Sequence, residues 1–267
     1  MLKVRVIPTL LWKDFGLVKG TGFDSWRRVG PVLPAIKVYN QREVDELILV
    51  DILAHGNGAE PDVEAIDDFS QDCFVPLTVG GGITRIDQVQ RLLRAGADKV
   101  SINTAAYSTP GLVGEIAHRH GSQCVVASID VRQTAPGQWH CFSHAGQQAT
   151  QREVLTWARE LEDRGAGEIL LTSIERDGGM QGYDLALIER VAQAVRIPVI
   201  ASGGAGNYQH MVDAVQHAGA SAVAAASMFH FTEQTPAGAK AAMAAAGIAV
   251  RASFVTTPAP AHLPLAG

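Results

Sequence analysis

Eight short apolar runs, each followed by a stretch with helical spacing, constrain the fold of this 267-residue chain more than any other feature. Continuous apolar residues such as Leu47–Val50 are typical of strands that are covered on both faces, as in a parallel sheet. A strand and then a helix, repeated eight times, predicts an α/β fold, a single closed (βα)₈ barrel. The strand-like runs are Val4–Ile7, Leu47–Ile52, Pro76–Val79, Lys99–Ile102, Val125–Ile129, Glu168–Ile174, Pro198–Ala201 and Ala222–Ala226.

An internal repeat supports this prediction. Residues 78–83 match residues 201–206, and residues 95–97 match residues 218–220 at the same offset. Two half-barrels of four βα units explain these matches. We therefore expect one barrel domain over residues 1–251. Residues 252–267 lack periodicity and contain three prolines, so we expect a flexible C-terminal tail without a catalytic part.

Composition excludes several classes of protein. The chain is 47% hydrophobic and 18% charged, which favours a large buried core over disorder. The net charge of −5 and the lack of a basic block argue against nucleic-acid binding. No apolar run reaches membrane-spanning length and no signal peptide precedes the first run, so we expect a cytoplasmic protein. Neither the three scattered cysteines nor the nine histidines have metal-ligand spacing, and no metal site is predicted.

Two pairs of glycines follow apolar runs and precede helical segments. Gly81 and Gly82 lie in the first half of the chain, and Gly203 and Gly204 lie in the second. Glycine lets the backbone approach a ligand closely and present N–H groups to an anion. A helix that begins just beyond adds its positive dipole end. We expect both pairs to bind phosphate; the alternative is that these glycines only allow tight turns.

The next apolar run in each half ends at a second pair of candidate residues. These pairs are Asn103-Thr104 and Ala226-Ser227. Barrels commonly bind phosphate in the loops after strands seven and eight, which here correspond to the second half. Two such sites on opposite sides of one mouth predict a phosphorylated small-molecule ligand with an anionic group at each end.

Two aspartates are further candidates for ligand contacts. Asp177 follows the sixth run and precedes Gly178, and both are assigned to the ligand site. Asp51 ends the second run and is either a substrate contact or a cap for the next segment.

Four charged residues mark the beginnings of strands, at the opposite end of the barrel. They are Arg5, Glu46, Lys99 and Glu168, two of each sign. Charges inside a barrel are costly unless they pair, so we expect them to close a neutral ring. A purely stabilising role is the alternative to a functional one.

Four longer stretches resemble the cyclase subunit of imidazole glycerol phosphate synthase. They are residues 78–83 (TVGGGI), 96–106 (GADKVSINTAA), 165–174 (GAGEILLTSI) and 201–206 (ASGGAG). The similarity extends from residue 1 to about residue 251. It implies a barrel that takes ammonia from a glutaminase subunit docked on its N-terminal face and needs no metal or organic cofactor. The charged residues named above would then form the gate through which ammonia enters.

The resemblance also implies two catalytic aspartates, acting as general acid and base at the ends of strands one and five. Asp130 stands at the second of these positions, whereas Leu11 occupies the first. A leucine cannot transfer a proton. Lys19, which belongs to the mobile first loop in this family, is retained and is assigned to ligand binding.

Three functions therefore stay open. Leu10-Leu11 and residues 39–47 resemble a second branch of the family, which accompanies a glutaminase and an ATP-using amidotransferase that converts an acetamido sugar into an acetamidino sugar. In that branch the barrel is expected to deliver ammonia. The alternatives are the histidine-pathway cyclase itself and the related phosphoribosyl isomerase, which Leu11 disfavours equally.

Overall fold

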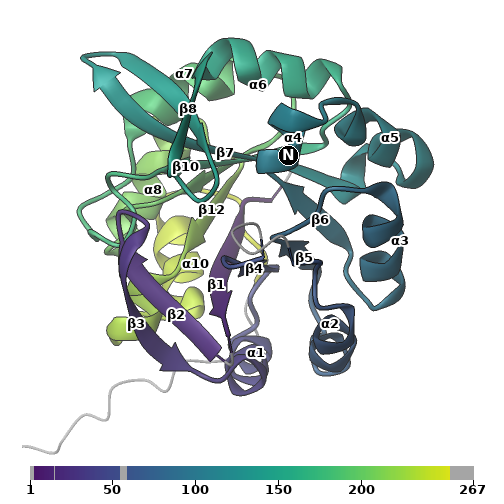
Figure 1. Cartoon of the computed structure of the whole chain (residues 1–267). Helices are drawn as coiled ribbons and strands as arrows, with labels where there is room; N and C mark the ends of the chain where they lie inside the picture. Colours follow the sequence, from purple (N-terminus) through teal and green to yellow (C-terminus); the bar gives the residue numbers. More distant parts are fainter. Residues whose placement is uncertain (1–2, 15, 55–58, 253–267) are drawn as a thin grey trace, which may run out of the picture.

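Eight parallel strands form a closed ring in the computed structural model, which describes residues 3–14, 16–54 and 59–252 (Figure 1). Neighbours in the ring follow the chain, and β10 closes it by pairing with β7 on one side and β11 on the other. The predicted (βα)₈ barrel is thereby confirmed. The ring strands are β1 (Arg5–Lys13), β4 (Leu47–Asp51), β5 (Leu77–Gly80), β6 (Lys99–Ile102), β7 (Val125–Ala135), β10 (Glu168–Ser173), β11 (Val199–Ser202) and β12 (Ala222–Ala225).

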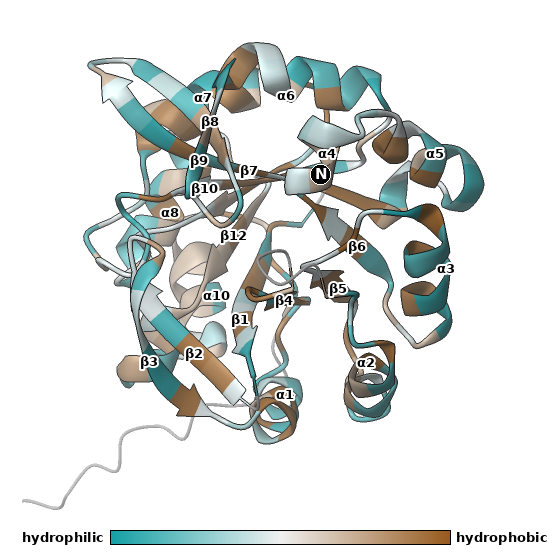
Figure 2. Ribbon diagram, viewed as in Figure 1, coloured by the Kyte–Doolittle hydropathy of each residue, from teal (hydrophilic) through white to brown (hydrophobic). Residues whose placement is uncertain are grey.

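Helices cover the outside of this ring, with their apolar sides toward the strands (Figure 2). Local signals set their starts: Asp184 accepts a hydrogen bond from the Leu187 N–H at 3.1 Å, and Asn207 accepts one from the His210 N–H at 3.0 Å. The helices are α1 (Val32–Gln41), α2 (Val63–Ser70), α3 (Ile86–Arg94), α4 (Thr104–Ser108), α5 (Gly111–His120), α6 (Val154–Asp163), α7 (Leu185–Ala194), α8 (Tyr208–Gln216), α9 (Ser227–Phe231) and α10 (Pro236–Ala245), with a 3₁₀ turn, η1 (Ser122–Cys124).

The apolar residues of the barrel separate into an outer core and an inner one. Side chains alternate along each strand, so one set packs against the helices and the other fills the ring. The outer core includes Leu10, Leu47 and Leu49. The inner core is small and separate; it consists of Ile7, Ile48, Val126, Leu170, Ile200, Ala222 and Ala224, with Val50 packed against them.

Two antiparallel additions extend the ring at its C-terminal end. The β2 (Gly16–Thr21) and β3 (Asp24–Gly30) hairpin pairs with β1, and β8 (Gln138–Ser143) and β9 (Gln148–Glu153) extend β7 (Figure 1). The sequence placed Lys19 in a loop and contained no sign of either hairpin. Both hairpins form because β1 and β7 continue beyond the ring and offer free edges for pairing. No helix in the described part of the chain has the length and apolar character needed to cross a membrane.

The predicted C-terminal tail lies almost entirely outside the described residues. The last described pairing is a parallel bridge between Val4 and Val250, which joins the end of the described chain to the start of β1.

Candidate functional site

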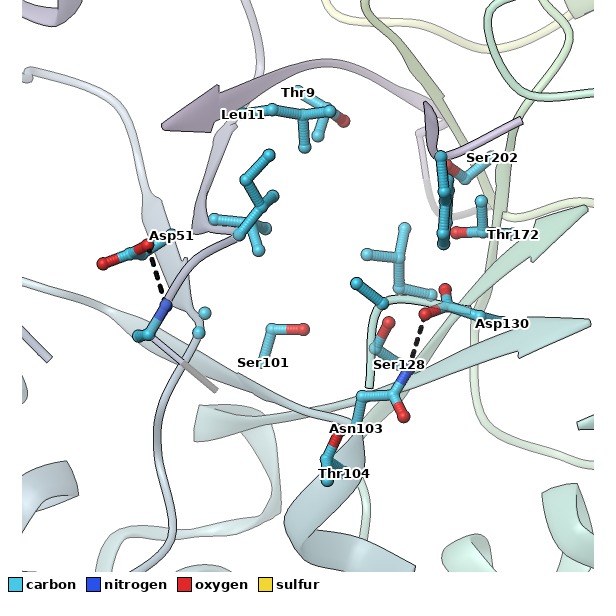
Figure 3. Close-up of a pocket in the computed structure, with 18 of the residues that line it drawn as sticks. Thr9, Leu11, Asp51, Ser101, Asn103, Thr104, Ser128, Asp130, Thr172 and Ser202 are labelled. Carbon is cyan, nitrogen blue, oxygen red and sulfur yellow. Dashed lines mark hydrogen bonds between the residues drawn. The ribbon is translucent and has the colours of Figure 1, made fainter. Parts of the chain in front are cut away.

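A cavity of about 560 Å³ opens at the C-terminal ends of the ring strands. Such a mouth is where barrel enzymes place their ligands. Polar side chains from several strands converge there (Figure 3). Twelve of the predicted site residues line it: Lys19, Gly81, Gly82, Asn103, Thr104, Asp130, Asp177, Gly178, Gly203, Gly204, Ala226 and Ser227.

Both glycine pairs adopt conformations that only glycine accepts without strain. Gly81 has φ +104° and Gly203 has φ +83°. A Cβ on Gly81 would lie 2.1 Å from the Asp51 carbonyl oxygen, and a Cβ on Gly203 would lie 2.6 Å from the Ser173 carbonyl oxygen. The same clash recurs in the two halves, so the internal repeat of the sequence is a repeat of the turn. Each turn brings bare backbone to the cavity wall, as an anion site requires.

The second member of each proposed anion site begins a short helix beside its glycine turn. Asn103 precedes α4 and Ala226 precedes α9. The Thr104 hydroxyl accepts a hydrogen bond from the His144 N–H at 3.0 Å, which ties this corner of the cavity to the β8–β9 turn. Two oxygen atoms, Oδ1 of Asn103 and Oγ1 of Thr9, are buried without a hydrogen-bond partner among the described residues, and both residues line the cavity. They fit ligand contacts.

Asp130 is the carboxylate at the centre of the polar wall. Its Oδ2 accepts a hydrogen bond from Nδ2 of Asn103 at 2.7 Å (Figure 3). Desolvation by burial raises the pKa of Asp130 to about 7, and the negative charge of Asp177 adds to this, while hydrogen bonds from Thr172 and Asn103 oppose it. Near neutral pH both protonation states are populated, so this group can accept and release a proton.

Leu11 lies on the other side of the same cavity. Figure 3 shows Thr9 and Leu11 on β1, across the opening from Asp130. The Cα register aligns Leu11 with Val50 of β4, and both residues line the cavity. In the described part of the cavity wall, β1 therefore offers no group that transfers protons at the position facing Asp130.

Lys19 lies in strand β2 and not in the loop expected for it. Its side chain is only 3% exposed and forms an ion pair with Asp177. The Gly22 N–H donates to the Asp177 carbonyl oxygen at 2.8 Å, which fixes the β2–β3 turn against the loop after β10. Gly178 allows this approach: a Cβ there would lie 2.2 Å from the Gly20 carbonyl oxygen.

The β2–β3 hairpin also brings aromatic residues that the sequence analysis did not assign. Phe23 and Trp26 line the cavity mouth. Phe23 lies near Gly146 of the β8–β9 turn, where an added Cβ would come 3.0 Å from its ring. The two hairpins thus meet over one side of the mouth. No sequence signal places them there, because the contact depends on the pairing of β1 with β2.

Four small polar residues in the barrel interior were also missed. Ser101, Ser128, Thr172 and Ser202 line the cavity between its mouth and the inner core. A signal was available, because Ser128 stands two positions before Asp130 and Ser101 two before Asn103. In a strand that spacing places both side chains on one face. For Asp51, the structure fits both roles considered from the sequence. Its Oδ1 accepts a hydrogen bond from the Leu53 N–H at 2.9 Å, as a cap of the next segment does, and the residue also lines the cavity.

The four charged residues at the opposite end form a closed ring, which we call the basal ring. Arg5 Nη1 lies 2.8 Å from Glu46 Oε1 and 3.0 Å from Glu168 Oε1. Lys99 Nζ lies 2.9 Å from the same oxygen of Glu46 and 3.2 Å from that of Glu168. Each glutamate contacts both cations, so the charges are paired as expected.

The inner core separates the basal ring from the cavity.

A profile of the family described as "Histidine biosynthesis protein" matches residues 5–235, from the first residue of β1 to just before α10. The chain belongs to this family. The match covers both glycine turns, Asp130 and the basal ring, so the parts described above belong to the family barrel. Within the described residues, no group of three or more His, Cys, Asp or Glu side chains is placed to hold a metal ion.

Proposed function

We propose that this histidine biosynthesis family barrel is the ammonia-delivering subunit of a glutamine amidotransferase system in the cytoplasm. A glutaminase subunit docks on the N-terminal face, and ammonia passes through the barrel to a biosynthetic acceptor. An ATP-dependent amidotransferase then uses the ammonia to convert an acetamido sugar into an acetamidino sugar. The observation that carries this proposal is Leu11, which faces Asp130 across an otherwise retained cavity.

The chemistry of ring closure explains why Leu11 argues against cyclase activity. Cyclisation with ammonia requires protons to be added and removed at different atoms, which two carboxylates with different pKa values can do. Here Asp130 is retained and Leu11 offers no proton. Delivery of ammonia has no such requirement, because a neutral molecule passes without proton transfer.

The barrel axis supports an ammonia path. The basal ring blocks the N-terminal end, and movement of one side chain, such as Lys99, would open it. Above it lies the inner core with small members such as Ala222 and Ala224. An apolar interior disfavours ammonium, since burying an unpaired charge is costly, and favours neutral ammonia. The hydroxyl groups of Ser101 and Ser128 then offer hydrogen bonds near the cavity.

The two glycine turns support a phosphorylated ligand at the mouth. Lys19, Gly81, Gly82, Asn103, Thr104, Asp177, Gly178, Gly203, Gly204, Ala226 and Ser227 are the proposed contacts.

Two observations favour a second candidate, the imidazole glycerol phosphate cyclase. Asp130 keeps a pKa of about 7, which suits general acid–base catalysis, and the Lys19–Asp177 ion pair adds a second carboxylate to the cavity. In this case a group other than residue 11 completes the proton transfers.

Ammonia-dependent cyclisation, assayed with the purified chain and with Leu11→Asp, separates the two candidates. We expect turnover by the native chain to be at least about a hundredfold below that of an authentic cyclase, since positioned proton transfer contributes ~10²–10⁴-fold. Leu11→Asp should raise turnover, whereas the matched variant Leu11→Asn should not. Native turnover equal to that of an authentic cyclase would refute the delivery role and establish the cyclase.

A further inference from the structure

The most exposed large apolar side chain in the described chain is Phe74, at 81% exposure. It lies in the segment that connects α2 to β5 (Figure 1). Only Val75 and Pro76 separate it from Leu77, the first residue of β5. Phe74 therefore lies at the N-terminal end of the barrel, opposite the cavity.

Backbone hydrogen bonds place this segment beside the basal ring. The Pro76 carbonyl oxygen accepts from the N–H of Leu47 at 2.9 Å, and Leu47 directly follows Glu46. On the other side, the Leu77 carbonyl oxygen accepts from the Asp98 N–H at 2.9 Å, and the Asp98 carboxylate accepts from the Leu77 N–H at 2.8 Å. Asp98 directly precedes Lys99. The segment is thus attached to both strands that carry ring residues next to β5.

The turn that presents Phe74 is held in one conformation. The Asn40 side chain donates to the Asp72 carbonyl oxygen and accepts from the Phe74 N–H at 3.2 Å. Lys37 forms a further ion pair with Asp72 at 3.3 Å. A turn whose backbone is held in this way loses little conformational freedom on binding, which suits the presentation of an interface anchor.

The surroundings of Phe74 indicate the chemistry of its partner. Four acidic residues, Asp67, Asp68, Asp72 and Asp98, lie on the adjoining segments and outnumber the exposed cations there, Lys37, which is paired with Asp72, and Arg94. A complementary partner surface has an apolar pocket with basic side chains at its edge.

We propose that Phe74 is the anchor through which the glutamine-hydrolysing subunit seats over the basal ring. This inference rests on the proposed function and adds the contact residue. A partner that feeds ammonia into the ring must cover its opening and exclude water there. An aromatic side chain inserted beside the opening fixes the partner over it.

Binding of the glutaminase subunit from the same organism, measured by calorimetry, tests the anchor. We expect Phe74→Ala to weaken binding at least about tenfold, as truncation of an interface anchor does, and Phe74→Leu to retain most of the affinity. The matched control is Phe142→Ala on the β8–β9 hairpin at the other end of the barrel, which should bind as the native chain does. Since Phe74 is exposed, its truncation should leave the thermal unfolding midpoint unchanged.

The outcomes separate this inference from the proposed function. If the native chain binds the glutaminase and Phe74→Ala binds equally well, the anchor is wrong and the delivery role stands. If the native chain does not bind the glutaminase at all, both the delivery role and the anchor role of Phe74 are wrong. If sedimentation shows that Phe74→Ala dissociates a dimer of this chain while glutaminase affinity is unchanged, Phe74 serves self-association and the anchor is again overturned.

Discussion

At the scale of single residues, the cavity combines one carboxylate that titrates near neutrality with an apolar residue facing it. Asp130 could be predicted from its place at the end of an apolar run. Its pKa could not, because that depends on burial and on Asp177, which comes from the loop after β10. Leu11 was equally visible in the sequence, but only the folded chain shows that it lines the cavity.

Replacement of Asp130 should change how stability depends on pH. The pKa of Asp130 is about 7 in the folded chain, above the value of about 3.9 expected in the unfolded chain, so the folded state binds this proton more tightly. The stabilising effect is complete below pH ~4 and is lost as the pH rises through about 7, with a slope of up to ~1.4 kcal/mol per pH unit. Asp130→Asn lacks this contribution.

Urea unfolding at pH 5, 6, 7 and 8 measures the effect. The free energy of unfolding of the native chain should fall relative to that of Asp130→Asn between pH 5 and pH 7. The fall should become shallower through pH 7 and should level off near pH 8, about one unit above the folded-state pKa. Parallel curves for the two proteins would show that the carboxyl group has an ordinary pKa.

At the scale of elements, the helices and ring strands were predictable and the hairpins were not. Ring strands are buried on both faces and show continuous apolar runs, as Leu47–Val50 does. Strand β3 carries exposed residues such as Arg27 and Arg28, and β9 is also largely exposed, so neither shows an apolar run. These edge strands exist because β2 and β8 pair with extensions of the ring. The contacts that the hairpins make at the mouth, including those of Phe23 and the Lys19–Asp177 ion pair, could therefore not be predicted from the sequence.

Gly178→Ala should displace the β2–β3 hairpin. Gly178 has φ +75°, and its Cβ would lie 2.2 Å from the Gly20 carbonyl oxygen, so the loop and hairpin cannot keep their contact. We expect a loss of ~1–3 kcal/mol in stability and faster proteolytic cleavage within residues 16–30. Gly30→Ala is the matched control on the same hairpin, because a Cβ there meets no atom within 4 Å. Equal cleavage of the two variants would mean that the hairpin does not depend on this contact.

At the scale of the whole molecule, the barrel has a charged end, an apolar middle and a polar mouth. The basal ring was predictable as four charges at strand starts, and the structure adds that each glutamate contacts both cations. Lys99→Ala removes two of the four contacts and leaves both glutamates to Arg5 alone. We expect this variant to leak ammonia, so that glutamine hydrolysis no longer matches nitrogen transfer to the acceptor.

Isotope competition in the reconstituted complex tests ammonia delivery through the barrel most directly. The chain is combined with the three proposed components: a glutaminase from the same organism, an ATP-dependent amidotransferase and an acetamido sugar. Glutamine carries ¹⁵N in its amide, and unlabelled ammonium is present in large excess. With the native chain, mass spectrometry should find mostly ¹⁵N in the acetamidino product, and with Lys99→Ala the label should fall toward that of the bulk ammonium. A native product with the isotopic composition of the bulk pool, or no product at all, would contradict delivery of ammonia through this barrel.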